Sequence, residues 1–401
     1  MRSLFAHREF RLLLAGQSLS TLGDRLVFVA LALYVTEIGS PSDVGIVLAS
    51  HAVPLVGFLL IGGVWADRLP RHLVVVTTDV IRFGLHALLA LLIFTGTVEI
   101  WHIAVIEACF GTAEAFYRPA FTGLVPQTVP EEEIQPARAA FGTVETMAEF
   151  AGPALATALV LGVGPGWAFA LDAATFLVSA VFLVRLRPRK RGEPAERTTV
   201  LAELREGWTE VRSHTWIWVI VGVFSLGLLT AFGPWMTLGP TISQETYDTR
   251  AVYGILVSAM GAGTIVGALI GFRWKPEFPM RMGMLLALGL PISLGLFGLG
   301  LPVAVLLPVF VFAGSGIALF DIWWHTALAE RVPPHMLSRV TAYDWMGSLA
   351  LLPIGYVLAG PLGEALGAVE VLSVGSAIAL AALAGALLFR DVRQLRRLER
   401  V

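Results

Sequence analysis

The sequence predicts an all-α integral membrane protein with about twelve transmembrane helices in two similar halves of six. Of its 401 residues, 56% are hydrophobic and only 14% are charged, whereas soluble proteins carry about 25% charged residues. Glycine and proline are abundant inside the apolar stretches, as is usual for transmembrane helices. Because one span needs about 20 apolar residues, the length accommodates about a dozen spans joined by short loops.

The apolar runs place six predicted spans on each side of a polar middle segment. In the first half they cover residues 11–37, 43–66, 73–95, 100–127, 137–162 and 167–186. In the second half they cover residues 215–241, 251–273, 281–300, 303–328, 339–362 and 368–389. The chain therefore divides into an N-terminal bundle (1–186), a linker (187–213) and a C-terminal bundle (214–401). Within the linker, residues 200–211 have the pattern of an amphipathic helix on the membrane surface.

The positions of arginine and lysine predict the orientation of these spans. Basic residues gather before the first span, in the linker and after the last span, whereas the opposite loops carry acids such as Glu37, Glu99 and Glu364. Basic loops stay on the cytoplasmic side. We therefore expect a multi-pass protein of the bacterial cytoplasmic membrane with both termini and the linker in the cytoplasm.

An internal repeat supports the division into halves. A shift of 203 positions places Gly111 on Gly314 and Gly152 on Gly355. A repeat that keeps its direction after an even number of spans implies two parallel bundles related by an axis along the membrane normal.

A short charged turn joins the second and third predicted spans. From Gly63 to His72 it reads Gly-Val-Trp-Ala-Asp-Arg-Leu-Pro-Arg-His. Charge persists at a membrane only where water or protein groups satisfy it. We expect Asp67, Arg68 and Arg71 to form a conformational latch; the alternative is a loop kept basic for topology alone.

This turn resembles the signature loop of the major facilitator superfamily, roughly G-x-L-A-D-R-x-G-R-K, and the resemblance extends over nearly the whole chain. The loop matches at Gly63, Ala66, Asp67, Arg68 and Arg71 and departs at Trp65, Pro70 and His72. Within the superfamily the chain is similar to the macrolide-efflux and enterobactin-exporter group, through three short segments: Leu22-Gly23-Asp24, Asp79-Val80-Ile81-Arg82 and Tyr117-Arg118-Pro119-Ala120.

The resemblance implies the major facilitator fold and transport by alternating access. It implies that Asp67 faces the start of span eleven, at residues 334–338. The pair Gly152-Pro153 matches part of a helix motif found in exporters. Asp79 and Arg82, three residues apart near the start of span three, are expected to brace the charged turn.

Several ionisable residues fall inside predicted spans, where an acid costs about 2.5–3.5 kcal/mol at the helix centre. We expect these residues to face the protein interior, either paired with one another or lining a shared watery cavity between the bundles. They are Asp24, Glu107, Glu114, Arg118, Glu145, Glu149, Asp172, Asp321, His325 and Asp344.

Spacing groups the charges of spans four and five. Glu114 and Arg118 share one face of span four, and Glu145 and Glu149 lie one turn apart on span five. Arg118 and Glu145 are expected at similar depth, within reach of a salt bridge. That leaves Glu149 or Glu114 without a cationic partner, and such a carboxylate tends to take up a proton. The alternative is that Arg118 satisfies both acids and only locks the two helices together.

Three further residues are candidates for the cavity. Asp24 lies deep in span one with Arg25 about 100° away around the helix, so we expect Asp24 to bind a proton or a cationic group, or else to be buried with a polar partner. Asp321 and His325 lie four residues apart, and a histidine beside a carboxylate can titrate near neutral pH; the alternative for His325 is packing. The 203-residue shift places Arg118 on Asp321, so the pair is expected to balance charge across the cavity.

The sequence contains no nucleotide-binding P-loop, no His-Glu-x-x-His zinc motif and no Gly-x-Ser-x-Gly elbow. It predicts neither an enzyme nor a bound cofactor or metal, and no nucleic-acid partner. Transport energy must then come from a gradient, for which protons fit the embedded acids and sodium stays open. We predict a monomeric, proton-coupled exporter of lipophilic or amphiphilic small molecules. The alternatives are a lysophospholipid-type flippase or facilitator and a polytopic lipid-modifying enzyme.

Overall fold

The computed structural model describes residues 3–189, 200–271, 273–333 and 336–397. Within these ranges the side chains of Leu60, Val64, Ala66, Asp67, residues 200–204 and Ser338 are outside the description. The described chain contains helices and turns and no strands, so the all-α prediction is confirmed. It forms two compact units, Met1–Glu193 and Pro194–Val401.

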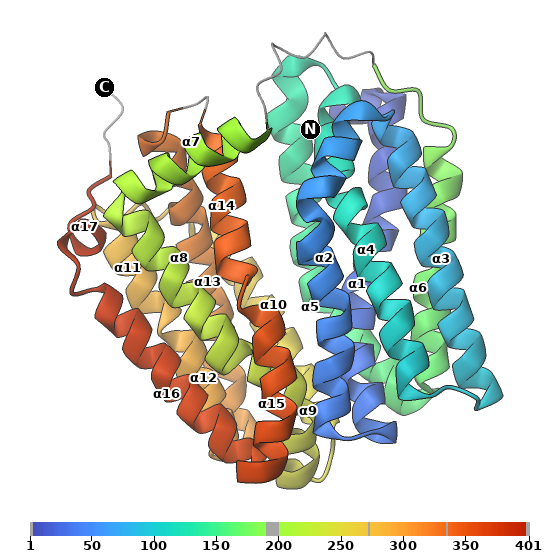
Figure 1. The fold of residues 1–401 in the computed structure, drawn as a ribbon, viewed down its shortest axis with the longest axis vertical. Helices are drawn as coiled ribbons and strands as arrows, with labels where there is room; N and C mark the ends of the chain where they lie inside the picture. Colours follow the sequence, from blue (N-terminus) through green and yellow to red (C-terminus); the bar gives the residue numbers. More distant parts are fainter. Residues whose placement is uncertain (1–2, 190–199, 272, 334–335, 398–401) are drawn as a thin grey trace. The chain divides into compact units, whose positions relative to one another are not determined.

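Among its described residues the first unit holds six long helices, which Figure 1 labels, and three short 3-10 turns. The long helices are α1 (Arg8–Ile38), α2 (Pro41–Arg68), α3 (Arg71–Thr95), α4 (Ile100–Leu124), α5 (Ile134–Gly162) and α6 (Pro165–Leu183). The short turns are η1 (Leu4–Ala6), η2 (Val125–Gln127) and η3 (Glu131–Glu133).

The helices of the second unit are interrupted more often than those of the first. Its elements are α7 (Val200–Ser213), α8 (Thr215–Gly227), the π-helix η4 (Leu228–Phe232), α9 (Gly233–Tyr247), α10 (Ala251–Gly271), α11 (Pro279–Ala287), α12 (Gly289–Gly298), α13 (Val303–Arg331), α14 (Leu337–Leu349), α15 (Leu352–Leu366), α16 (Ala368–Ala386) and α17 (Arg390–Arg393). Three predicted spans are each formed by successive pieces: α8, η4 and α9; α11 and α12; α14 and α15.

Local signals explain where the helices begin and end. Ser40 and Asp43 form a capping box at the start of α2, in which each side chain bonds the backbone N–H of the other residue. Gly96 ends α3 in the left-handed conformation (φ 69°), which glycine adopts without steric cost. Between α2 and α3 only Leu69 and Pro70 are non-helical, so the charged turn is very tight.

Eleven helices of the described chain are long and apolar enough to cross a membrane. The remaining predicted span is α4, which is 25 residues long and is absent from those eleven. Its embedded charges, Glu107, Glu114 and Arg118, lower its hydropathy. Among the predicted spans, α4 is thus the one whose membrane character is least visible from composition.

The helices of the two units pack in the same order. In the first unit α2 packs on α4, α3 on α6, and α1 on α5 and α6. In the second unit α10 packs on α13, α12 on α16, α9 on α15 and α8 on α16. Each pair in the second unit is the counterpart of one in the first under the 203-residue shift.

Glycines at the repeated positions let helices touch. A Cβ atom on Gly111 would overlap the backbone carbonyl oxygen of His51, and one on Gly314 would overlap that of Met260. The predicted small-residue stripe of span eight likewise presents Gly263 and Gly267 to the α13 backbone. Close backbone approach through small residues is the usual way in which membrane helices associate.

Helix α7, which falls inside the predicted linker, packs against α8 and α14 of the second unit. Arg339 of α14 pairs with Glu206 of α7, and the rings of Trp208 and Tyr343 lie 5.7 Å apart. The amphipathic helix expected at 200–211 is therefore present and is attached to the second bundle.

Candidate functional site

Buried polar side chains collect in the interior of the first unit, on helices that are otherwise apolar. An unpaired charge in such a place is costly, so each ionised group needs a partner. Two clusters meet this need, one around Arg82 on α3 and one along α4.

Arg82 is the centre of the first cluster and is fully buried (0% exposed). Its Nη2 donates to Asp79, one turn earlier on α3. The guanidinium carbon lies 4.1 Å from the centre of the Tyr117 ring and 4.3 Å from that of Phe176. Aromatic faces attract a cation most strongly where water is excluded, so the rings hold the charge in place.

Asp79 also accepts hydrogen bonds from side chains of neighbouring helices. Its Oδ2 accepts hydrogen bonds from Ser179 Oγ at 2.7 Å and from Gln17 Nε2 at 3.2 Å, and Tyr117 donates to Gln17. The cluster ties α1, α3, α4 and α6 together in the bundle core. This differs from the expectation that Asp79 and Arg82 would brace the charged turn, because α3 carries them more than two helical turns away from it.

Asp24 shares the same guanidinium. Its Oδ2 lies 3.6 Å from Arg82 Nη1, beyond hydrogen-bond distance, while Asp79 holds the other arm. The Asp24 side chain is 35% exposed. One cation thus serves two carboxylates, and Asp24 is the less tightly held of the two.

The second cluster is a chain of side chains in which carboxylates and imidazoles alternate. It starts at a half-exposed arginine and ends at a fully buried aspartate, with every member in contact with the next. In order, its members are Arg118, Glu114, His51, Glu107, His86 and Asp172.

The first half of this acid–imidazole chain joins α4 to α2. Arg118 donates to Glu114 Oε1 through Nε at 2.8 Å and Nη2 at 2.6 Å. The other Glu114 oxygen lies 2.9 Å from His51 Nε2, and His51 Nδ1 lies 3.1 Å from Glu107 Oε2. Both nitrogens of His51 therefore contact an acid.

The second half joins α4 to α3 and α6. His86 Nε2 lies 3.5 Å from Glu107 Oε1, and His86 Nδ1 is hydrogen-bonded to Asp172. The 3.5 Å contact is not a hydrogen bond, and neither of its two buried atoms has another hydrogen-bond partner among the described residues. The Phe110 ring stacks on His86 with centroids 4.2 Å apart and contacts His51 at 5.7 Å.

The predicted salt bridge between Arg118 and Glu145 is wrong. Arg25 on α1 takes Glu145 at 3.3 Å and Glu149 at 3.1 Å, and Arg118 pairs within its own helix. The reason is the packing: α5 lies against α1 rather than against α4. Both Glu114 and Glu149 consequently have a cation, and the prediction that one of them lacks a cation is also wrong.

The exporter-type pair Gly152-Pro153 lies where α5 crosses α1. Both residues are buried, and a Cβ atom on Gly152 would come within 2.7 Å of Arg25 Cβ. Glycine at this position lets α5 approach closely enough for Arg25 to reach both of its acids.

His51 and His86 were missed by the sequence analysis. Both lie inside predicted spans, and an ionisable side chain inside a span is a functional candidate by default. The rule that selected the embedded acids would have selected these histidines too.

The charged turn is described in part. The expected contact between Asp67 and the start of span eleven lies outside the described residues. It would involve the side chains of Asp67 and Ser338 and residues 334–335, which the structure does not describe. Arg71 donates to the carbonyl oxygen of Gly123 at 2.8 Å, at the end of α4, where the helix dipole favours a cation. Arg68 is exposed at the end of α2, and the Cα of Gly63 faces open space.

The candidates of the second unit lie apart from any comparable network in the described part of the chain. Asp321 is 62% exposed and lies 3.3 Å from His325, so the predicted pair is present. Asp344 accepts from Trp324 Nε1 at 2.9 Å. Trp323 and Trp324 are buried in the hydrophobic core.

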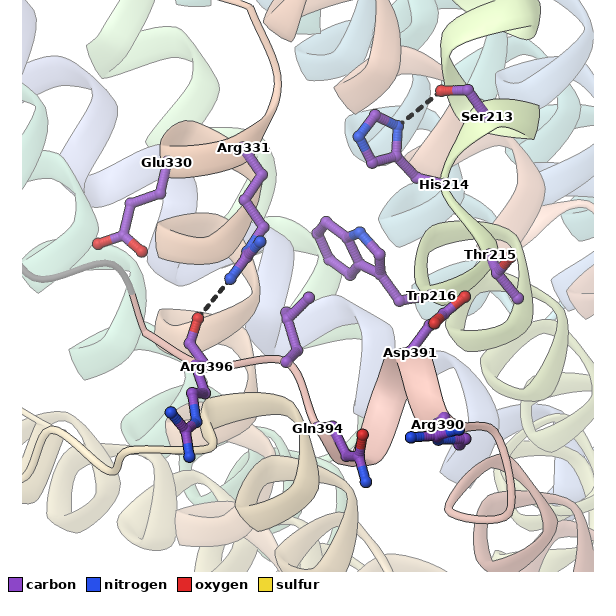
Figure 2. A pocket seen from close by; sticks show the side chains of 11 residues that line it. Ser213, His214, Thr215, Trp216, Glu330, Arg331, Arg390, Asp391, Gln394 and Arg396 are labelled. Atoms are coloured by element: carbon purple, nitrogen blue, oxygen red, sulfur yellow. Dashed lines mark hydrogen bonds between the residues drawn. The ribbon is translucent and has the colours of Figure 1, made fainter.

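A cavity of about 910 Å³ opens in the second unit between the start of α8, the end of α13 and α17. Figure 2 shows Arg331 directed at the Arg396 backbone, where it donates to the carbonyl, and His214 bonded to Ser213. None of the predicted site residues lines this cavity.

Bacterial efflux proteins are among the relatives of this chain. The chain is 22% identical over 379 residues to macrolide efflux protein A of Streptococcus pyogenes, covering 90% of each chain. It is 25% identical over 362 residues to the multidrug efflux pump Tap of Mycolicibacterium fortuitum, covering 86% of this chain and 87% of the relative.

Among solved structures, a point mutant of the nucleoside transporter NupG superposes with a TM-score of 0.75 at 14% identity, covering 95% of this chain and 99% of the other. That likeness concerns the fold alone. Residues 13–349 match the sequence profile of the Major Facilitator Superfamily. The chain therefore belongs to the Major Facilitator Superfamily, a family of multi-pass membrane transporters.

Proposed function

We propose that this protein is a proton-coupled exporter of lipophilic or amphiphilic small molecules in a bacterial cytoplasmic membrane. It works as a monomer with both termini in the cytoplasm. The observation that carries the proposal is the sharing of one buried guanidinium, that of Arg82, between Asp79 and the partly exposed Asp24.

Charge counting explains why Asp24 is the coupling acid. With Arg82 and both aspartates ionised, the first cluster has one negative charge in excess. A proton on Asp24 removes that excess, and its departure restores it. A change of one charge in a low-dielectric bundle shifts the relative free energy of two conformations, which is what couples a proton to transport.

Asp24 reaches the surrounding space and Asp79 does not. Asp79 is fully buried and bonded on both oxygens, so its protonation would break several hydrogen bonds. Within the described residues, Asp24 has only the 3.6 Å contact to lose. Sodium is the competing ion, since a carboxylate oxygen also suits that cation.

The relatives support the export direction and the kind of substrate. One carries macrolide efflux in its name and another multidrug efflux. The turn of Asp67, Arg68 and Arg71 would serve as the latch between conformations, with Arg71 anchored on the end of α4.

The test uses the purified protein in liposomes with an imposed pH gradient, a lipophilic cationic dye and an internal pH indicator. Wild type is expected to accumulate dye only with the gradient and to move protons in return. The variant Asp24→Asn should lose gradient-driven accumulation, because the amide cannot exchange a proton. The exposed acid Glu132, changed to Gln, is the control and should behave as wild type.

Three outcomes contradict the proposal. Dye accumulation that ignores the gradient in wild type removes proton coupling, and rescue by a sodium gradient assigns the coupling to that ion. Movement of a labelled lysophospholipid without dye movement favours the flippase alternative. Full coupling in Asp24→Asn shows that another group carries the proton.

A further inference from the structure

We propose that the acid–imidazole chain is a proton relay that connects partly exposed Glu114 to the buried face of α1 beside Asp24. This inference rests on the proposed function, and it assigns a role to two histidines, His51 and His86, that the coupling acid alone does not need.

The alternation of groups is what a relay requires. A neutral imidazole carries a proton on one nitrogen and accepts on the other. His51 and His86 each present both nitrogens to acids. Glu107 presents one oxygen to each ring. A proton taken up on one side of each group can therefore leave from the other side.

The acid–imidazole chain also extends from a partly exposed group to the buried interior of the bundle. Glu114 and Glu107 are two helical turns apart on α4, which is about 10 Å along the axis. The side chain of Glu114 is 17% exposed, whereas Asp172 is fully buried. At the buried end, a Cβ atom on Gly23 would overlap Asp172 Oδ1, so the last acid touches the residue that precedes Asp24.

The proton transfer balances step by step. A proton on Glu114 Oε2 moves to His51 Nε2, while the proton on His51 Nδ1 moves to Glu107 Oε2. Rotation of the Glu107 carboxyl brings that proton to His86 Nε2, and the proton on His86 Nδ1 moves to Asp172. Only N–H and O–H bonds break and form, and each proton that leaves one group arrives on the next.

The contact between Glu107 and His86 is the gate of the relay. It is the longest link in the chain, and its two facing atoms have no hydrogen-bond partner within the described ranges. Stacking on Phe110 holds the His86 ring plane, so closure depends on the Glu107 side chain and on the crossing of α3 with α4. A conformational change that moves these helices would open or close the relay.

The charged groups around His51 and His86 are balanced, so a proton can pass through either imidazole without fixing one neighbouring group in its ionised form. His51 on α2 faces Glu107 and Glu114 of α4. His86 faces Glu107 of α4 and Asp172 of α6, with Arg82 one turn earlier on α3 and Asp24 beyond it on α1. If both imidazoles are protonated, the chain from Arg118 to Asp172 carries three positive and three negative charges. It can therefore lose or gain one proton without a large net charge.

The competing explanation is that the chain only locks α2, α3, α4 and α6 together. The variants His51→Gln and His86→Gln distinguish a relay from a structural lock, because an amide keeps hydrogen bonds but cannot pass a proton. The control is His102→Gln, at the exposed start of α4 and outside the chain. Proteoliposomes report two rates: gradient-driven dye accumulation with its proton flux, and dye exchange without a gradient.

The relay predicts that both histidine variants lower coupled proton flux by roughly 100-fold, as expected when a proton-transfer group is removed, while exchange stays within about twofold. The pH profile of coupled transport should flatten in both. A structural lock predicts instead that the rate of dye exchange and the thermal stability fall together. The number of protons moved per dye molecule would then stay normal, and this result overturns the relay.

Where the histidine variants do not fold, Glu107→Asp decides the question. It keeps the charge but withdraws the carboxylate by one methylene from His86, so the relay predicts slower coupled flux with normal exchange. Wild-type coupling in Glu107→Asp overturns the relay. If wild type itself shows no proton coupling, both the proposed function and the relay fail. If Asp24→Asn loses coupling and the histidine variants keep it, only the relay fails.

Discussion

Arg82 shows most clearly how a single residue organises this bundle. It is buried among Tyr117 and Phe176 and compensates two carboxylates, Asp79 and Asp24. The sequence places Asp79 and Arg82 on one helix face three residues apart, so their pairing follows from helix geometry. That Asp24 shares the same cation depends on the packing of both α1 and α3 against α6, which local sequence does not encode.

Removal of the Arg82 charge is expected to destabilise the protein by about 3–5 kcal/mol, because Asp79 is left as an uncompensated buried charge. The measurement is thermal or denaturant unfolding of Arg82→Gln in detergent. The double variant Arg82→Gln with Asp79→Asn should regain a substantial part of the loss, since it removes both charges. Equal instability of the single and double variants would contradict the assigned pairing. Arg82→Lys should be intermediate, because lysine keeps the charge but not the planar stack.

At the scale of the element, packing is controlled by glycines at equivalent places in the two units. Gly111 brings α4 onto α2, and Gly314 brings α13 onto α10, each against a backbone carbonyl. The repeat of these glycines was visible in the sequence. It reflects close approach of two helices, which small residues at a crossing allow. The π-helix η4 was not visible. It lies opposite Gly355, the counterpart of Gly152, and a one-residue widening of a helix leaves no periodic signal.

A methyl group at a helix crossing should force the helices apart. We expect Gly314→Ala to destabilise the protein by about 1–3 kcal/mol, as overpacking does. Gly142→Ala on α5 is the matched control, because its Cβ would meet no atom within 4 Å, and helix propensity alone makes it neutral or stabilising by up to about 1 kcal/mol. Thermal unfolding of both variants in the same detergent checks this. Equal melting temperatures would show that the α10–α13 crossing tolerates a side chain.

At the scale of the whole molecule, the two units share helix order but not chemistry. The 203-residue shift carries His51, Glu107 and Glu114 onto Gly254, Phe310 and Ile317. The corresponding core of the second unit is aromatic, with Trp235 and Phe310 fully buried. The groups of the proposed proton path thus lie in the first unit, although both units share one helical pattern. The expected charge balance of Arg118 against Asp321 stays a prediction.

The proposed orientation predicts which loops face the cytoplasm. With Cys109, the only cysteine, replaced by serine, Thr97→Cys between α3 and α4 should react with an impermeant maleimide in intact cells. Glu132→Cys between α4 and α5 should react only after permeabilisation. Both positions are exposed, so differences in reactivity report the side of the membrane. The opposite pattern would invert the topology.

The sequence by itself determined the membrane class, the near-complete set of spans and the burial of charge inside them. These follow from apolar run length and from the cost of charge in hydrocarbon, both of which are local properties. Only the tertiary structure decided which acid receives which cation: α5 packs on α1, so Arg25 takes Glu145 and Glu149, and Arg118 stays with Glu114. Ion pairing acts over a few ångströms between helices far apart in the chain, and the order of helices around a bundle is fixed by side-chain packing over the whole unit.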